Sequence, residues 1–227
     1  MPKFDDPRAR VAAAYDAAAD AYDDAANAFW ARFGQRTIDR LRLAPGARVL
    51  DACCGSGASA LPAAAAVAPA GSVLGVDLSA RLLELARAKA AARGVANVEF
   101  RQADLLELDA PPSSFDAVVC VFGIFFLSDM AAGVRALWRL VKPGGVLAIT
   151  TWGPRFLEPG STAFWQAVAA VRPDLYKGFN PWDRIQEPEA LCALLREGGV
   201  EDPRAEPEAG AHPIPSPEAW WGDAAPP

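Results

Sequence analysis

The chain has 227 residues, of which 52% are apolar and 22% are charged, and its formal net charge is −6. This length is enough for one α/β domain with a full core, and the apolar content excludes a disordered protein. The acidic balance, with no basic cluster, argues against nucleic acid or an anionic membrane as a partner. We therefore expect one domain over residues 1–227 that acts on a small molecule.

The sequence has no apolar run long enough to cross a bilayer, and its first seven residues are polar and lack an apolar signal core. The four cysteines, Cys53, Cys54, Cys120 and Cys192, have neither the spacing of a disulfide ladder nor that of a zinc site. We therefore expect a reduced, cytoplasmic protein with no integral membrane segment and no metal.

The first predicted element is an alanine-rich helical cap over residues 8–42. Tyr15 and Tyr22 are seven residues apart and therefore share one helix face. Two interpretations remain open for this face. It packs on the sheet, or it forms a lid whose tyrosines touch the cofactor or the substrate.

Between residues 43 and 152, short apolar runs alternate with helical patterns, as expected of a cofactor-binding core. We predict strands over residues 48–52, 73–77, 98–101, 116–121 and 146–152, and helices over residues 58–67, 80–93 and 130–141. Repeated βα units of this length predict a doubly wound, mostly parallel, Rossmann-like sheet with helices on both faces.

The last third of the chain departs from this alternation. Residues 153–186 are rich in proline and aromatic residues, which predicts a partly helical insertion that caps the substrate over the carboxyl edge of the sheet. Residues 187–227 hold a predicted helix, 188–198, and one extended edge strand within 200–217. We find no pattern for a seventh strand and therefore expect a truncated C-terminal part and a bare edge on the fifth strand.

The most informative motif is the segment from Val49 to Gly57, in which a buried strand meets Asp51 and then a glycine turn. Asp77 ends the next predicted strand, and Asp104 follows the third. Because the carboxyl ends of parallel strands form one ligand crevice, we expect these carboxylates to lie close together. Each one alone is equally explained as a strand-end cap or a turn residue.

Three carboxylates at this edge suit S-adenosylmethionine, which carries a sulfonium and an ammonium against a single carboxylate. Asp77 can accept hydrogen bonds from both ribose hydroxyls, and Asp104 can accept one from the adenine amino group. Asp51 can order the glycine turn and bind the methionine ammonium directly or through water. The alternative is a dinucleotide, because residues 55–60 fit GxGxxA, but Asp51 would repel its pyrophosphate.

Five motifs follow one another in a fixed order, at residues 49–57, 76–79, 102–105, 115–119 and 140–145, after a Tyr-Asp pattern at 15–16 and 22–23. Over residues 12–221 the chain resembles the class I S-adenosylmethionine-dependent methyltransferases, closest to the ubiquinone/menaquinone-biosynthesis-type C-methyltransferase group. One departure is Cys53, where many relatives carry glycine and close relatives often carry alanine. The resemblance implies cofactor contacts at Asp51, Ala52, Gly55, Gly57, Asp77, Leu78, Asp104, Leu105, Val121 and Tyr15.

We assign no catalytic residue. Methyl transfer from a sulfonium needs an aligned nucleophile more than a covalent catalyst, and the only histidine, His212, lies in a proline-rich stretch away from the crevice. Asp129 and Tyr22 are the other candidates for a base. Residues 122–127 are apolar, and their aromatic rings either pack in the core or steady the sulfonium.

We therefore expect a small apolar or aromatic acceptor with a carbon or oxygen nucleophile, such as an enol, a phenolate or an electron-rich ring. Two alternatives are a degenerate or truncated cofactor-binding domain without turnover and an NAD-binding oxidoreductase.

Overall fold

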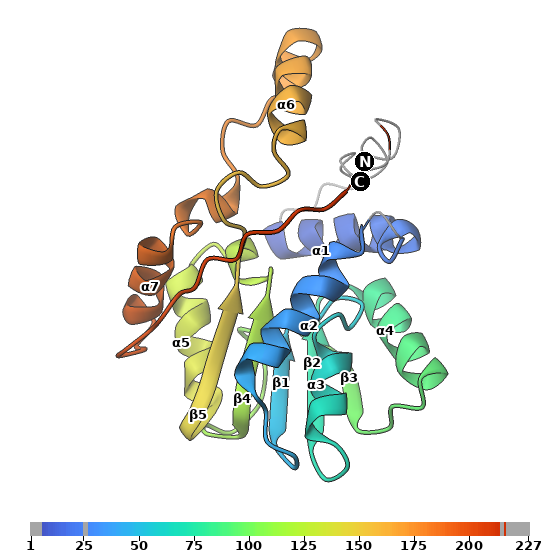
Figure 1. The fold of residues 1–227 in the computed structure, drawn as a ribbon, viewed down its shortest axis with the longest axis vertical. Coiled ribbons are helices and arrows are strands. Elements are labelled where there is room, and N and C mark those ends of the chain that lie inside the picture. Colours follow the sequence, from blue (N-terminus) through green and yellow to red (C-terminus); the bar gives the residue numbers. More distant parts are fainter. Residues whose placement is uncertain (1–5, 25–26, 214–215, 217–227) are drawn as a thin grey trace.

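The computed structural model describes residues 6–24, 27–213 and 216. Its centre is a parallel sheet in the order β3-β2-β1-β4-β5 (Figure 1). The strands are β1 (Arg48–Ala52), β2 (Ser72–Asp77), β3 (Val98–Gln102), β4 (Phe115–Val121) and β5 (Val141–Thr150). The helices are α1 (Pro7–Ala18), α2 (Phe29–Leu41), α3 (Ala60–Val67), α4 (Ala80–Ala92), α5 (Met130–Leu140), α6 (Gly160–Val171) and α7 (Pro188–Glu197).

Two apolar clusters sandwich the sheet. One face packs against α2, α3 and α4, and the other packs against α5 and α7. Strand β4 is buried from both sides, and its Val118, Val119 and Cys120 are fully buried. A strand covered on both faces is expected to be apolar throughout rather than alternating, which is how this segment reads in the sequence. The predicted doubly wound, Rossmann-like fold is confirmed.

The strand order places a topological switch between β1 and β4. The chain leaves β1 for β2 and β3 on one side and then returns to lay β4 against the other side of β1. At such a switch the loops after the two central strands diverge and leave a crevice at their carboxyl ends. The glycine turn after β1 and the loop after β4 therefore face each other.

The start of the fifth strand differs most from the sequence prediction. Strand β5 begins at Val141, directly after α5, and an irregularity in its pairing with β4 lies between Phe115 and Ala117. Val141 pairs with Phe115 and Val146 pairs with Ala117, so residues 142–145 lie between the two paired positions, where proline and glycine favour a turn.

The strand predicted within 200–217 is wrong for the part that the structure describes. Residues 203–213 form no strand, and 214–215 and 217 lie outside the described residues. Pro203, Pro207 and Pro213 lack the amide hydrogen that a sheet ladder needs. The segment instead crosses over α2, where Arg40 forms ion pairs with Glu206 and Glu208 (Figure 1). Within the described residues no strand pairs with the outer edge of β5.

The proline-rich insertion is partly helical, as predicted. It holds α6 and two short 3-10 helices, η4 (Pro173–Leu175) and η5 (Pro181–Arg184). Helix α6 projects away from the sheet (Figure 1). No helix in the described part of the chain combines the length and apolarity needed to cross a membrane.

Candidate functional site

A cavity of about 100 Å³ opens at the carboxyl ends of β1 to β4. The loops after these strands form its floor, and the N-terminal helical segment covers it. Seven of the ten predicted cofactor contacts line this cavity: Tyr15, Gly55, Asp77, Leu78, Asp104, Leu105 and Val121. The other three, Asp51, Ala52 and Gly57, lie outside its lining.

The glycine turn needs its glycines for different reasons. Gly55 has φ +51° and Gly57 has φ +87°, and this left-handed region favours glycine. The amide of Gly55 faces the cavity and donates to Asp77 Oδ2 at 2.8 Å. Gly57 instead faces the core, where a Cβ would meet Leu61, Ala86 and Phe100 at 3.4 Å. Gly57 therefore shapes the turn, while Gly55 leaves its backbone open to a ligand.

Asp77 links two loops of the site. Its Oδ2 accepts from the Gly55 amide, and its Oδ1 accepts from the Ser79 amide at 2.9 Å, at the N-terminus of α4. Burial raises the pKa of Asp77 above its usual range, although these amides oppose the shift. A ligand that brings positive charge and hydroxyl donors would offset this desolvation, as the ribose and sulfonium of S-adenosylmethionine would.

Asp51 is fully buried beneath the turn. Its Oδ2 accepts from Ser59 Oγ at 2.7 Å, just before α3, whereas Oδ1 has no hydrogen-bond partner among the described residues. Burial raises the pKa of Asp51 to about 7. The carboxyl therefore ties the end of β1 to the residue before α3, and its roles in ordering the glycine turn and binding the cofactor's ammonium stay predictions.

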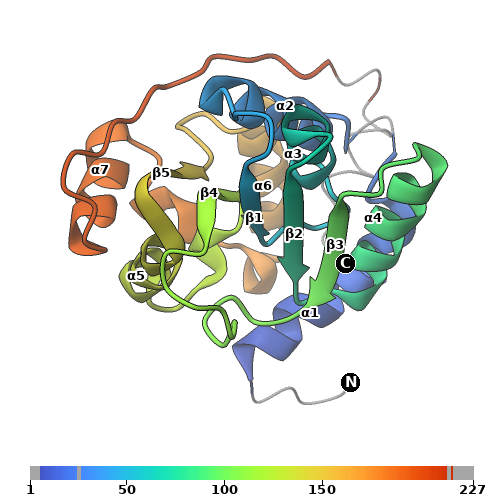
Figure 2. The ribbon, with the colours of Figure 1, turned by 90° about the horizontal axis from the view of Figure 1, so that it is seen from below.

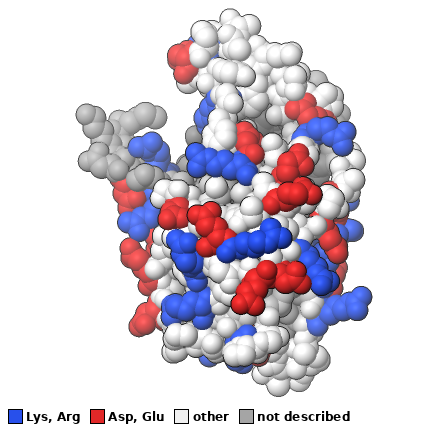
Figure 3. Space-filling model, turned by 90° about the vertical axis from the view of Figure 1, so that its left-hand side faces the viewer, with Lys and Arg blue, Asp and Glu red and all other residues white. Residues whose placement is uncertain are grey.

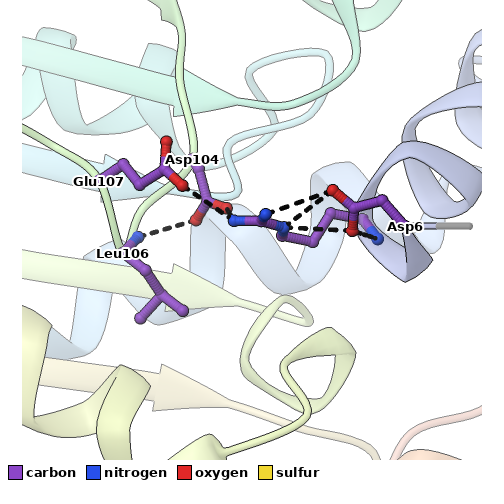
Figure 4. A network of polar contacts seen from close by, with 5 residues as sticks. Asp6, Asp104, Leu106 and Glu107 are labelled. Atoms are coloured by element: carbon purple, nitrogen blue, oxygen red, sulfur yellow. Dashed lines mark hydrogen bonds and ion pairs between the residues drawn. The ribbon is translucent and has the colours of Figure 1, made fainter.

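Asp104 is held at the cavity wall by two donors (Figure 4). The Leu106 amide donates to Oδ1 at 2.8 Å, and Arg8 Nη1 donates to Oδ2 at 2.8 Å. Arg8 also donates to Glu107 Oε1 at 3.0 Å and itself lines the cavity. Arg8 could not be singled out from the sequence, because an exposed arginine near a helix start has no pattern that marks a distant partner.

Aromatic rings form the side of the cavity nearest β4. Tyr22 stacks on Trp30 with ring centroids 5.6 Å apart, and Tyr15 meets Phe126 edge to face at 5.6 Å. Phe122 lines the cavity and stacks on Trp152 at 3.8 Å. Burial raises the pKa of both tyrosines, so they are neutral hydroxyls at physiological pH and Tyr22 is poorly suited to act as a base.

The remaining candidates for a base lie away from the cavity. Asp129 accepts from the Ala132 amide and caps α5, and its side chain is 63% exposed. His212 packs edge-on against Phe29, and neither residue lines the cavity. Among the residues that the structure describes, no cluster of His, Cys, Asp or Glu could hold a metal ion.

Cys53 fits the site because of Gly123. Cys53 has φ +59°, and a Cβ on Gly123 would lie 2.4 Å from the Cys53 Cβ and 2.8 Å from its Sγ. The absence of a side chain at Gly123 therefore makes room for the thiol. The chain accommodates this departure from the motif without closing the cavity, which Cys53 lines.

Comparison with known proteins agrees with this geometry. The family model for a methyltransferase domain matches residues 49–145. Demethylmenaquinone methyltransferase of Geobacillus kaustophilus is 32% identical over 187 residues, which cover 78% of this chain and 80% of that protein. Aklanonic acid methyltransferase DauC of Streptomyces sp. (strain C5) is 32% identical over 202 residues, which cover 84% of this chain and 91% of the relative.

The chain spans about half the length of other quinone-biosynthesis relatives that it matches. A solved S-adenosylmethionine-dependent methyltransferase from Aquifex aeolicus superposes with a TM-score of 0.64 at 20% identity, covering 83% of this chain and 90% of that one. This likeness shows the shared fold. The family match and the relatives show that S-adenosylmethionine is the cofactor of this enzyme, and the cavity is consistent with it. The chain belongs to the S-adenosylmethionine-dependent methyltransferases, in the group of the ubiquinone and menaquinone methyltransferases.

Proposed function

We propose that this enzyme transfers the methyl group of S-adenosylmethionine to a carbon or oxygen nucleophile on a small, ring-bearing, apolar acceptor. The observation that carries the proposal is a cavity with two unlike sides. Carboxylates from Asp77 and Asp104 line one side, and Trp30, Phe122 and Phe126 line the other.

The carboxylate side is the proposed cofactor half. Asp77 would accept from the ribose hydroxyls and Asp104 from the adenine amino group, with Gly55 beneath the methionine part. Leu78 and Leu105 would pack on the adenine ring. Tyr15 and Val121 would contact the cofactor nearer the sulfonium, while Asp51, Ala52 and Gly57 would shape the turn.

The aromatic side is the proposed acceptor half. S-adenosylmethionine would supply an electrophilic methyl group: an acceptor that has already lost its proton, such as a phenolate, would form the new bond to the methyl carbon as the carbon–sulfur bond breaks and its electron pair returns to sulfur. Alignment alone can lower such a barrier by roughly 7–11 kcal/mol. Loss of the sulfonium charge also weakens the product's attraction to the carboxylates, which favours its release.

Two further observations support the choice of acceptor. The relatives are named for a demethylated menaquinone and for aklanonic acid, and an apolar aromatic wall suits a ring-bearing acceptor. The net charge of −6 argues against nucleic acid, and Figure 3 shows acidic and basic side chains interspersed on the face that includes α7. We also propose that the enzyme works in the cytoplasm, which the four free cysteines support.

The test combines calorimetry with mass spectrometry. The protein should bind S-adenosylmethionine and not NAD, and it should add 14 mass units, about one methylene, to a demethylmenaquinone or to an aromatic polyketide acid. Binding without turnover on any ring-bearing acceptor, or activity only on a basic peptide, contradicts the proposal.

A matched pair of variants tests the acceptor half. Trp30→Ala should raise the KM for the acceptor and leave the Kd for the cofactor within about twofold. Trp165→Ala is the control, because Trp165 lies on α6 and does not line the cavity. Thermal melts of both variants check folding, since Trp30 also packs against the core.

A further inference from the structure

Residues 6–24, here called the N-terminal lid, form the roof of the cofactor cavity. The lid supplies Arg8, Val11, Ala12, Tyr15 and Tyr22 to the lining. Its helix α1 lies across the ends of β2 and β3 (Figures 1 and 2). None of the side chains of α1 that the structure describes is fully buried. Tyr15 of α1 packs edge to face on Phe126, with ring centroids 5.6 Å apart, so apolar contacts hold α1 only in part, and a segment with few fully buried side chains opens at low cost.

Three polar anchors also hold the lid, and each of the three reaches the loop after a different strand. Asp23 Oδ1 accepts from Ser56 Oγ at 2.7 Å, in the glycine turn after β1. Asp16 Oδ1 accepts from Ser79 Oγ at 2.6 Å, in the loop after β2. Each of these three anchors lies within two residues of a proposed cofactor contact: Ser56 beside Gly55, Ser79 beside Leu78, and Asp104 itself. Two further ion pairs, Arg81 with Asp20 at 2.6 Å and Lys89 with Asp23 at 2.8 Å, tie the lid to α4.

Arg8 makes the third anchor by donating to Asp104 and Glu107, which follow β3 and are labelled in Figure 4. Its guanidinium contacts Asp104, Glu107 and Asp6, at distances of 2.8, 3.0 and 3.2 Å. The Asp104 side chain is only 9% exposed, whereas that of Arg8 is 47% exposed. The pair therefore joins a carboxylate in the cavity wall to a cation on the outer rim.

The geometry also fixes how Asp104 can meet a ligand. One of its oxygens accepts from the Leu106 amide and the other from Arg8. Each oxygen of an ionised carboxylate keeps a further acceptor site, and the two donors set the plane of the group. An amino group in the cavity then meets a carboxylate that is already oriented.

We propose that Arg8 is a positioning residue for the cofactor, which orients Asp104 and clasps the lid over the adenosine end. The cofactor and its demethylated product leave when this clasp opens. The inference rests on the proposed function, because it takes Asp104 as the partner of the adenine. Arg8 sets residence time, and the chemistry of methyl transfer does not involve it.

The test measures dissociation of S-adenosylmethionine and S-adenosylhomocysteine by stopped-flow fluorescence. Arg8→Ala should raise both dissociation rates about fivefold, the upper end for a partly exposed ion pair. Arg101→Ala is the matched control: Arg101 has the same 47% exposure and the same 2.8 Å pairing, with Glu99, and it does not line the cavity. Its dissociation rates should equal those of the wild type.

The salt dependence of dissociation distinguishes a clasp formed by Arg8 from a general structural role of this residue. The wild-type dissociation rates should rise with sodium chloride, and those of Arg8→Ala should rise less steeply, because the variant lacks one screened ion pair while Arg81–Asp20 and Lys89–Asp23 remain. Arg8→Lys should restore part of the slow release, since it keeps the charge but loses the fork of donors.

The possible outcomes distinguish failure of this inference from failure of the proposed function. If the wild type binds both ligands and Arg8→Ala releases them at the wild-type rate, the inference is overturned. If the wild type binds neither ligand, the proposed function fails instead. Should Arg8→Ala not fold, Arg8→Gln takes its place. This variant removes the charge that pairs with Asp104, so unchanged release from it also overturns the inference.

Discussion

The contact between Gly123 and Cys53 offers a stringent test of the site's packing. In Gly123→Ala, the new Cβ would lie 2.4 Å from the Cys53 Cβ, 2.8 Å from its Sγ and 3.0 Å from Cys120 Sγ. Ordinary contacts of this kind are 3.4–4 Å, so the nearest atoms overlap by about an ångström. Overpacking of a closed site typically costs 1–3 kcal/mol, and we expect about 2 kcal/mol here.

The effect should depend on the thiol. Cys53→Gly removes the two nearest atoms and suits the positive φ of that position, which leaves only the contact with Cys120. Gly123→Ala should then cost less than about 1 kcal/mol. The coupling free energy between the two positions should accordingly be on the order of 1–2 kcal/mol.

Urea unfolding of the wild type, both single variants and the double variant measures this coupling. For a chain of this size, a loss of about 2 kcal/mol lowers the Tm by roughly 4–8 °C. Gly153→Ala serves as the control, because the nearest atom to its new Cβ would be 4.0 Å away. Equal destabilisation by Gly123→Ala in both backgrounds would refute the steric reasoning.

Three further changes probe other parts of the site. Asp77→Asn keeps the shape of the side chain but lets only one of its atoms accept from a backbone amide. Calorimetry should therefore show a Kd for S-adenosylmethionine raised by roughly 10- to 100-fold. An unchanged Kd counts against Asp77 as a cofactor contact. Burial raises the pKa of Asp51 to about 7, so the folded state binds more protons than the unfolded state, whose carboxyl titrates near about 4. As the pH rises from about 4 to 7, the free energy of unfolding should therefore fall by on the order of 1 kcal/mol per pH unit. Asp51→Asn should lack this fall in urea melts. If the wild type and the variant show parallel pH profiles, the explanation is excluded. Trp152→Ala removes the ring stacked 3.8 Å from Phe122 and should lower the free energy of unfolding by about 3–5 kcal/mol in urea melts. A loss below about 1 kcal/mol would mean that the stack contributes little to stability.

The gathering of carboxylates at one edge of the sheet could be predicted from a single rule of parallel sheets. Parallel strands end at the same edge, so recognising strands that end near Asp77 and Asp104 was enough to bring these carboxylates together. Asp51 stands one residue before the end of β1, and its burial beneath the turn depends on backbone angles that spacing does not reveal. The proposed cofactor roles of the ten residues, and the division of the chain into cap, core, insertion and C-terminal part, stay predictions.

Contacts between distant segments could not be predicted. Arg8 and Asp104 are 96 residues apart, and no local pattern marks an arginine that pairs across such a distance. The stack of Phe122 on Trp152 and the space that Gly123 leaves for Cys53 likewise arise only when separate strands come together. The edge strand predicted near the C-terminus was wrong because an extended proline-rich pattern specifies backbone shape without specifying a partner.

The double attachment of Asp77 has a consequence for engineering this enzyme to accept altered nucleosides. One carboxylate both braces two loops and offers itself to the ligand, so any replacement disturbs scaffold and recognition at once. Leu78 lines the same cavity without such bracing hydrogen bonds from its side chain, which is purely hydrocarbon. Libraries aimed at enlarged or base-modified cofactors should therefore begin at position 78 and leave position 77 untouched.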